Sequence, residues 1–263
     1  IVFEAPRQAD AKRDNMQGAY LGPSYGNEQA MDICRKFNAP YEKFDDEKAL
    51  CDKVADLLND GKVIGWFQGR MEYGPRALGN RSILGDPRNP EMQKRLNLKI
   101  KYREGFRPFA PSVLTEKAAE YFELEGDSPY MLLTVPVREN IRKQLPPNYD
   151  DLPMFERLYF IRSELPAITH IDYSARLQTV NKETNPRYWN LLNAFNEKYG
   201  CPVVVNTSFN VRGEPIVCTP KDAYLCFMRT EMDYLILNDL LLEKSKQPEL
   251  KNDEDWREKF VLD

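Results

Sequence analysis

Short apolar runs alternate with amphipathic segments along most of this chain, and the alternation leaves few possible folds. The runs VIGWF (63–67) and CPVVV (201–205) have the length and composition of buried strands. In residues 46–58, leucine and valine recur at three- and four-residue steps, which predicts an amphipathic helix. Because the two kinds of segment are interleaved, we expect an α/β or α+β fold with a mixed β-sheet flanked by helices.

The same patterns predict the other elements and three regions of the chain. Further helices are expected at 27–37, 90–98, 115–122 (capped by Thr115), 185–199 and 220–229, and strands at 109–114, 130–137, 168–180 and 234–238, the last taken as the final strand. Residues 1–26 are polar and turn-rich, as in an extended arm or linker, residues 27–245 form one domain, and residues 246–263 form an acidic tail. Since the chain begins with Ile1 instead of Met, we interpret it as a piece of a longer protein whose N-terminal domain is missing.

Charge is distributed unevenly along the chain. The net charge is −4 and the pI about 5.4, which argues against a general nucleic-acid-binding protein. Residues 70–107 nevertheless contain ten Lys/Arg and four Asp/Glu, a local charge of +6. Such a window fits either a site for a compact anion or a solvated helix face, and composition alone leaves both interpretations open.

Cysteine and histidine content excludes several classes of site. The five cysteines include no CxxC pair and His170 is the only histidine, so neither a zinc site nor a disulfide framework is expected. We expect reduced thiols in a cytoplasmic protein.

No apolar run approaches the ~18 residues of a membrane-spanning helix, so no membrane association is expected. A lone histidine is more often structural than catalytic, and no mechanism is built on His170.

The stretch WFQGRMEYGPRALGNRSIL (66–84) matches no ordinary helix or strand pattern. It contains three arginines and three glycines, and glycine lets backbone N–H groups approach an oxyanion closely. Arginine adds a planar charged fork that matches phosphate or carboxylate. Arg70 lies close enough in sequence to Glu72 to pair with it and have a structural role. The alternative for the whole stretch is a surface ion-pair network.

A second polar cluster, NTSFNVRGEPIV (206–217), follows a buried strand. Its small hydroxyl and amide side chains could contact an anion or could simply hydrogen-bond a loop. The Walker motif GxxxxGK[ST] and the Rossmann motif GxGxxG are both missing from the sequence. If the two clusters bind an anion, the site has another design.

Four segments together carry a family resemblance: WFQGRMEYGPRALGNRSIL, KYREGFRPFAPSVL, ITHIDYSARLQTV and VVVNTSFNVRGEPIVCTPKDA. In this order they resemble the C-terminal part of the NodU nodulation-protein and antibiotic O-carbamoyltransferase family, over residues 18–244. The resemblance implies a YrdC-like fold with a twisted mixed sheet. It also implies that a full-length protein would have an N-terminal domain of the ASKHA (actin-like ATPase) type, which this chain lacks.

The resemblance implies a transferase chemistry that uses two polyanions. The YrdC-like domain would join the carbamoyl group of carbamoyl phosphate to ATP, giving carbamoyl adenylate. The missing domain would then carbamoylate a small hydroxyl acceptor such as a sugar or an antibiotic-like compound. Mg²⁺ would be carried mainly by the ATP phosphates and not by a protein metal site. The metal-binding histidines of the N-terminal domain are absent, so this fragment would be incomplete on its own.

The KxR and SxN motifs of YrdC-type proteins match Lys101-Tyr102-Arg103 and Ser208-Phe209-Asn210. The resemblance implies that Lys101 and Arg103 hold the phosphates of both substrates. Arg76 would act with Lys101 and Arg103 as a catalytic group that stabilises charge. Nucleotide and substrate binding is implied for Arg81, Arg176, Thr207, Ser208 and Asn210. In-line displacement at phosphorus depends on positioning and electrostatics, which suits a chain without a Ser-His-Asp or Cys-His set.

Two other functions remain as alternatives. The chain could be a non-catalytic module that binds double-stranded RNA or a nucleotide, although its negative charge and the lack of interleaved aromatic residues argue against RNA. It could also be a scaffold that docks on the N-terminal domain.

Overall fold

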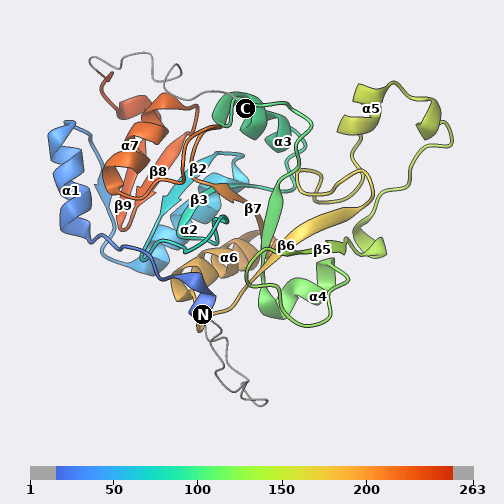
Figure 1. Ribbon diagram of the computed structural model, residues 1–263, viewed down its shortest axis with the longest axis horizontal. Coiled ribbons are helices and arrows are strands. Elements are labelled where there is room, and N and C mark those ends of the chain that lie inside the picture. Colours follow the sequence, from blue (N-terminus) through green and yellow to red (C-terminus); the bar gives the residue numbers. More distant parts are fainter. Residues whose placement is uncertain (1–15, 251–263) are drawn as a thin grey trace, which may run out of the picture.

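The computed structural model describes residues 16–250, whose strands form one mixed sheet in the order β1-β9-β8-β2-β3-β7-β4-β6-β5 (Figure 1). The strands are β1 Glu42–Lys43, β2 Ile64–Phe67, β3 Arg81–Gly85, β4 Ala110–Leu114, β5 Leu133–Pro136, β6 Ser174–Val180, β7 Val203–Ser208, β8 Tyr234–Leu237 and β9 Leu240–Glu243. β2 pairs with β8 and β4 with β6 in parallel, and the other neighbours are antiparallel. The predicted mixed sheet with helices is therefore confirmed.

Seven α-helices accompany the sheet in the described part of the chain. They are α1 Asn27–Lys36, α2 Glu47–Asn59, α3 Met92–Arg95, α4 Ala118–Tyr121, α5 Met154–Tyr159, α6 Pro186–Tyr199 and α7 Pro220–Arg229. Helix α6 packs on α2, β4 and β7, while α7 packs on α1, β2 and β8. Figure 1 shows α1 and α7 beside β8 and β9, with α5 standing away from the sheet at the opposite end. The central strands β2, β3 and β4 are buried throughout and carry the core.

Local sequence accounts for the ends of the long helices. The Asp46 carboxylate accepts hydrogen bonds from the first turn of α2, and the Asn185 side chain does the same for α6. Thr219 and Asp222 form a reciprocal capping box at the start of α7. Gly61, with φ +71°, follows α2 in a conformation that other residues rarely adopt. The helices predicted at 27–37, 46–58, 185–199 and 220–229 are confirmed.

Four predictions of local structure are wrong. The stretch 66–84 does contain a strand, β3, which lies between β2 and β7. The strand predicted at 168–180 begins only at Ser174, because residues 170–173 form a turn that is closed by the N–H of His170 donating to the Ser174 carbonyl. The strand at 234–238 is followed by another, β9, across a turn at Asn238 with φ +53°. Thr115 is not a cap: it lies inside the turn Thr115–Lys117, and its hydroxyl has no hydrogen-bond partner within residues 16–250.

Residues 16–26 lie against the loop that follows β2. Ser24 forms an isolated bridge with Arg70, and the N–H of Gly22 donates to the Met71 carbonyl at 2.9 Å. The remainder of the predicted arm, residues 1–15, and residues 251–263 of the predicted tail lie outside the described residues. Across residues 16–250, every helix is too short or too polar to cross a membrane.

Candidate functional site

Three neighbouring strands bring several of the predicted site residues to one end of the sheet. Strand β7 ends at Ser208, and its register places Asn206 opposite Ala110 at the start of β4. Strand β4 runs parallel to β6 with Ser112 opposite Gln178, so Arg176 near the start of β6 lies at the same end. Side chains two residues apart share a face of a strand, which puts Arg176 on the face of Gln178.

Lys101 is a buried cation at this end of the sheet, with only 3% of its surface exposed. Its Nζ donates to the main-chain and side-chain oxygens of Asn210, both at 2.8 Å, and to the carbonyl and hydroxyl oxygens of Ser208. All four acceptors are uncharged. Burial lowers the pKa of Lys101 to about 7, because nothing in this shell compensates the desolvation of the ammonium group.

Ser208 and Asn210 are held in one network with Lys101. The Ser208 hydroxyl donates to Asn210 Oδ1 at 2.7 Å, and Asn210 Nδ2 donates to the Glu214 carbonyl at 2.7 Å. The structure thus brings the two predicted motifs into direct contact. Thr207 pairs with Ile83, and strand alternation directs its side chain to the face opposite Ser208, away from this network.

Arg103 lies two residues after Lys101 and is held by neutral groups as well. Its Nε donates to Asn97 Oδ1 at 2.7 Å, and its guanidinium lies 5.0 Å from the centre of the Phe109 ring. Burial, with a further effect from Arg107, lowers the pKa of Arg103 to about 10. Asn97 was not singled out from the sequence. It is a polar residue in a helical segment, and the structure shows that it is fully buried.

Arg76 and Arg176 come from distant parts of the chain and lie close enough to repel each other. Burial, and then the positive charge of Arg76, lowers the pKa of Arg176. The Nε of each side chain is buried and has no hydrogen-bond partner. Among residues 16–250, neither guanidinium is paired with a carboxylate. Two half-buried arginines in this condition are an electrostatic cost to the free protein.

The loop that carries Arg76 is fixed from inside by one carboxylate. Oε1 of Glu72 accepts hydrogen bonds from the backbone N–H groups of Leu78 at 2.7 Å, Asn80 at 2.8 Å and Arg81 at 3.1 Å. The predicted pairing of Glu72 with Arg70 is therefore wrong. Arg70 donates instead to the Gly22 carbonyl, at 3.0 Å.

The sheet fixes the same loop from the other side. Gln178 Nε2 donates to the Leu78 carbonyl at 2.8 Å, and Asn206 Nδ2 donates to the Ala77 carbonyl at 3.1 Å. The Ser112 hydroxyl connects these two amides by donating to Gln178 Oε1 at 2.6 Å and accepting from Asn206 Nδ2 at 3.0 Å. These three buried polar residues were not singled out as a network from the sequence. They set the position of the backbone beside Arg76.

Arg81, predicted to bind nucleotide, lies in a different environment. It is fully buried, and its guanidinium lies 3.6 Å from the centre of the Phe67 ring. Nη1 donates to the carbonyls of Gln68 at 2.6 Å and Asn80 at 2.9 Å, and Nη2 to those of Pro23 and Gly69. These contacts join the turn after β2 to residues 16–26. The structure thus gives Arg81 a place inside the fold and does not bring it to Lys101.

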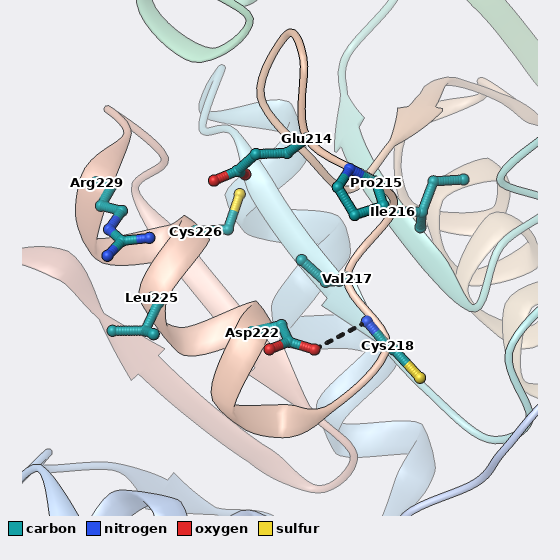
Figure 2. Close-up of a pocket in the computed structure, with 9 residues that line it drawn as sticks. All are labelled: Glu214, Pro215, Ile216, Val217, Cys218, Asp222, Leu225, Cys226 and Arg229. Carbon is teal, nitrogen blue, oxygen red and sulfur yellow. Dashed lines mark hydrogen bonds between the residues drawn. The ribbon is translucent and has the colours of Figure 1, made fainter. Parts of the chain in front are cut away.

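A cavity of about 380 Å³ lies beside the Ser208–Asn210 segment (Figure 2). It is lined by Glu214, Pro215, Ile216, Val217, Cys218, Asp222, Leu225, Cys226 and Arg229. Figure 2 shows the Glu214 carboxylate lying near the Cys226 thiol, between the 214–218 segment and α7. Burial raises the pKa of Glu214. Because the Glu214 carbonyl also accepts from Asn210, the cavity and the Lys101 network share one segment.

The donor groups of the described residues suit a polyanion better than a metal ion. Residues 16–250 contain no group of three or more His, Cys, Asp or Glu side chains that could hold a metal ion. Burial lowers the pKa of His170, and Arg176 adds to this effect while Asp172 opposes it. The cations Lys101, Arg103, Arg76 and Arg176, by contrast, fit a ligand with several negatively charged oxygens.

Comparison with known proteins finds relatives over most of the chain. The family described as Carbamoyltransferase C-terminus matches residues 55–244. Protein sll1178 of Synechocystis sp. is 58% identical over 96% of this chain and 41% of its own length. Nodulation protein NolO of Bradyrhizobium diazoefficiens is 42% identical, over 89% of this chain and 40% of its own. The 3'-hydroxymethylcephem-O-carbamoyltransferase of Amycolatopsis lactamdurans is 35% identical, over 74% and 33%.

The chain spans about two fifths or less of the length of these relatives. The family match covers well over half of the chain and includes Arg76, Lys101, Arg103, Arg176 and the Ser208–Asn210 segment. This chain therefore belongs to the carbamoyltransferase C-terminal family.

Proposed function

We propose that this chain binds ATP and carbamoyl phosphate and forms carbamoyl adenylate, as the C-terminal part of an ATP-dependent O-carbamoyltransferase. The observation that supports this most is the state of four cations: Lys101, Arg103, Arg76 and Arg176. None of them is paired with a carboxylate within residues 16–250. Elsewhere in the chain, Arg88, Arg95 and Arg187 are each paired with an aspartate.

Charge balance explains why a polyanion fits this site. Removing a cation from water without an opposite charge is unfavourable, and the lowered pKa values of Lys101, Arg103 and Arg176 reflect this cost. A triphosphate would supply the missing negative charge and several acceptor oxygens. Hydrogen bonds between such charged groups are the strong ones, above all when an arginine fork engages two oxygens.

The proposed reaction balances with water as a third reactant. Water takes the phosphoryl group of carbamoyl phosphate, which releases phosphate and carbamate. A carbamate oxygen then forms a bond to the α-phosphorus of ATP while the bond to the bridging α,β-oxygen breaks, and pyrophosphate leaves. Both steps are displacements at phosphorus, in which fixed cations stabilise charge on the equatorial and leaving oxygens.

Each residue has a proposed part in this scheme. Lys101 and Arg103 hold the phosphates of both substrates, and an entering phosphate oxygen replaces one of the four neutral oxygens around Lys101 Nζ. Arg76 stabilises the developing charge and Arg176 binds the same anion from β6. Ser208 and Asn210 orient the phosphate or the carbamoyl group, whereas Thr207, on the opposite face of β7, has no part in this contact. Arg81, with its guanidinium bonded to carbonyls, supports the loop that carries Arg76.

The remaining partners are assigned by the same proposal. Mg²⁺ would be held mainly by the ATP phosphates and would reduce their charge. Transfer to a small hydroxyl acceptor, such as a sugar or an antibiotic-like compound, belongs to the part of the longer relatives that this chain does not match. We place the reaction in the cytoplasm, where both proposed substrates would be available.

Carbamoyl-phosphate-dependent exchange of pyrophosphate into ATP tests the proposal. Lys101→Ala or Arg103→Ala is expected to reduce exchange by a factor of ~10² to 10³, by analogy with the loss of one oxyanion-hole donor. Lys99→Ala is the matched control, since Lys99 is a nearby exposed lysine paired with Glu231. Circular dichroism checks that each variant folds. Unchanged exchange in both folded site variants would refute the assignment of the KxR motif.

A further inference from the structure

Asn97 makes an unusual number of contacts around Arg103. It lies in the π-helical turn Leu96–Ile100 and is fully buried. Its Oδ1 accepts from Arg103 Nε at 2.7 Å, and its main-chain carbonyl accepts from the Arg103 N–H at 3.0 Å. Its Nδ2 donates to the carbonyls of Gly105 at 3.1 Å and Arg107 at 2.8 Å. One amide therefore fixes both the arginine side chain and the loop behind it.

These contacts orient Arg103 without using its two terminal nitrogens. The bond from Asn97 engages Nε alone, and Phe109 lies against the guanidinium. A carboxylate at position 97 could hold Nε equally well, as Asp86 does for Arg88 at 2.9 Å. The amide differs in two respects: it leaves the positive charge of the arginine uncancelled, and its Nδ2 donates to two carbonyls that a carboxylate could not engage.

We infer that Asn97 is a positioning residue, which aims Arg103 at a phosphate-bearing ligand while keeping the charge of its guanidinium available. The inference rests on the proposed function for the identity of that ligand. That Asn97 immobilises Arg103 concerns the free protein only, and one measurement tests it. That the neutral amide keeps the charge of Arg103 available to the ligand is tested by a second measurement.

The first measurement needs no ligand. In the wild-type protein, the Nε–H proton of Arg103 is expected to exchange slowly with water in nitrogen-15 NMR spectra, because it is buried and hydrogen-bonded. Asn97→Ser, which shortens the side chain beyond reach of Arg103, is expected to speed this exchange at least tenfold. Equal exchange rates in the two proteins would overturn the positioning role. If Asn97→Ser does not fold, rapid exchange of this proton in the wild type overturns it and slow exchange supports it.

The second measurement tests whether the neutral amide at position 97 strengthens anion binding. Asn97→Asp keeps the size of the side chain and its bond to Arg103 but adds a negative charge beside the guanidinium. Calorimetric titration with ATP, and separately with inorganic pyrophosphate, is expected to show affinity at least ~tenfold lower, as for a like charge placed near a bound anion. The free variant should have a lower thermal midpoint, because a carboxylate cannot donate to the Gly105 and Arg107 carbonyls, so the titrations are run at a temperature where circular dichroism shows it folded.

Asn59→Asp is the matched control. Oδ1 of Asn59 accepts from Arg88 Nη2 at 2.9 Å, so Asn59→Asp also adds a negative charge beside an arginine, but outside the site. Its affinity for pyrophosphate should equal that of the wild type. Wild-type affinity in folded Asn97→Asp would overturn the charge argument. If Asn97→Asp does not fold, Asn97→Ser must lose affinity in the wild-type background and none in an Arg103→Met background.

The failure of this inference can be told apart from failure of the proposed function. A wild-type protein that binds neither ATP nor pyrophosphate contradicts the proposed function and, with it, the charge argument. The exchange rate of the Arg103 Nε–H proton still decides whether Asn97 holds the side chain.

Discussion

At the scale of single residues, the site is defined by how its cations are held. Lys101 faces four neutral oxygens, Arg103 an amide and an aromatic ring, and Arg76 and Arg176 each other. The family resemblance implied that the KxR and SxN motifs surround the same phosphates, and the structure shows Lys101 in contact with Ser208 and Asn210. The sequence could not predict the environment of the Arg81 side chain. Whether an arginine points to a ligand or to backbone carbonyls depends on how distant segments pack around it.

Lys101 should make stability depend on pH in a specific direction. Burial lowers its pKa from 10.5 to about 7, so between these values the unfolded chain binds more protons at this position than the folded chain. The free energy of unfolding therefore gains a contribution that increases as pH rises from 7 to 10.5. Lys101→Met removes this contribution. Lys244, whose pKa is also lowered by burial, and the other titratable groups contribute equally to the pH dependence of both proteins.

Urea unfolding at pH 7 and pH 9.5 measures this effect. The wild type should gain stability relative to Lys101→Met between the two pH values. A constant difference between the two proteins would contradict an unpaired, buried Lys101.

Arg76 should lower the stability of the free protein while it raises affinity for anions. Arg76→Gln removes its repulsion with Arg176 and is expected to raise the free energy of unfolding by about 0.5 kcal/mol at low salt, a typical size for a partly exposed charge pair. The same variant should bind pyrophosphate at least ~tenfold more weakly. Arg35→Gln, which removes an exposed arginine paired with Asp32, is the control. Equal pyrophosphate affinity in all three proteins would remove Arg76 from the site.

At the scale of elements, the loop between β2 and β3 is the part that the sequence described least well. The long helices could be predicted because their caps and apolar spacing are local signals. Strand β3 was missed because it begins with the buried Arg81 directly after a glycine-rich loop, and its pairing with β2 and β7 is not local. Glu72, Gln178 and Asn206 determine the loop, and they come from three separate segments.

Gly79 is where this loop touches α6, and it gives the loop a stability test. A Cβ atom at Gly79 would lie 2.1 Å from the Tyr188 ring, on a backbone with φ +105°. Gly79→Ala is expected to cost about 2 to 4 kcal/mol, since backbone strain and overpacking combine. Gly74→Ala also has a positive φ, +126°, but meets no atom within 4 Å, so it should cost only about 1 kcal/mol. Equal denaturation midpoints for the two variants would contradict the packing of the loop on α6.

At the scale of the whole molecule, the net charge of −4 conceals a local concentration of positive charge. The fold brings Arg176 close to Arg76 and sets Ser208 and Asn210 against Lys101, although about a hundred residues of sequence separate the partners in each case. Alternating apolar runs were enough to predict a mixed sheet with helices, but not the strand order, which depends on long-range pairing. The chain also covers only about two fifths or less of its longer relatives. Under our proposal, its part in the complete reaction is the formation of an activated carbamoyl group.

A crystal structure of this protein with ATP and carbamoyl phosphate bound tests the central claim most directly. We expect phosphate oxygens within hydrogen-bonding distance of Lys101 Nζ and of the guanidinium groups of Arg103, Arg76 and Arg176. Ser208 and Asn210 should be the nearest neutral groups to the same phosphates. Phosphates bound at another face of the protein, with these four cations left as they are in the free protein, would contradict the account.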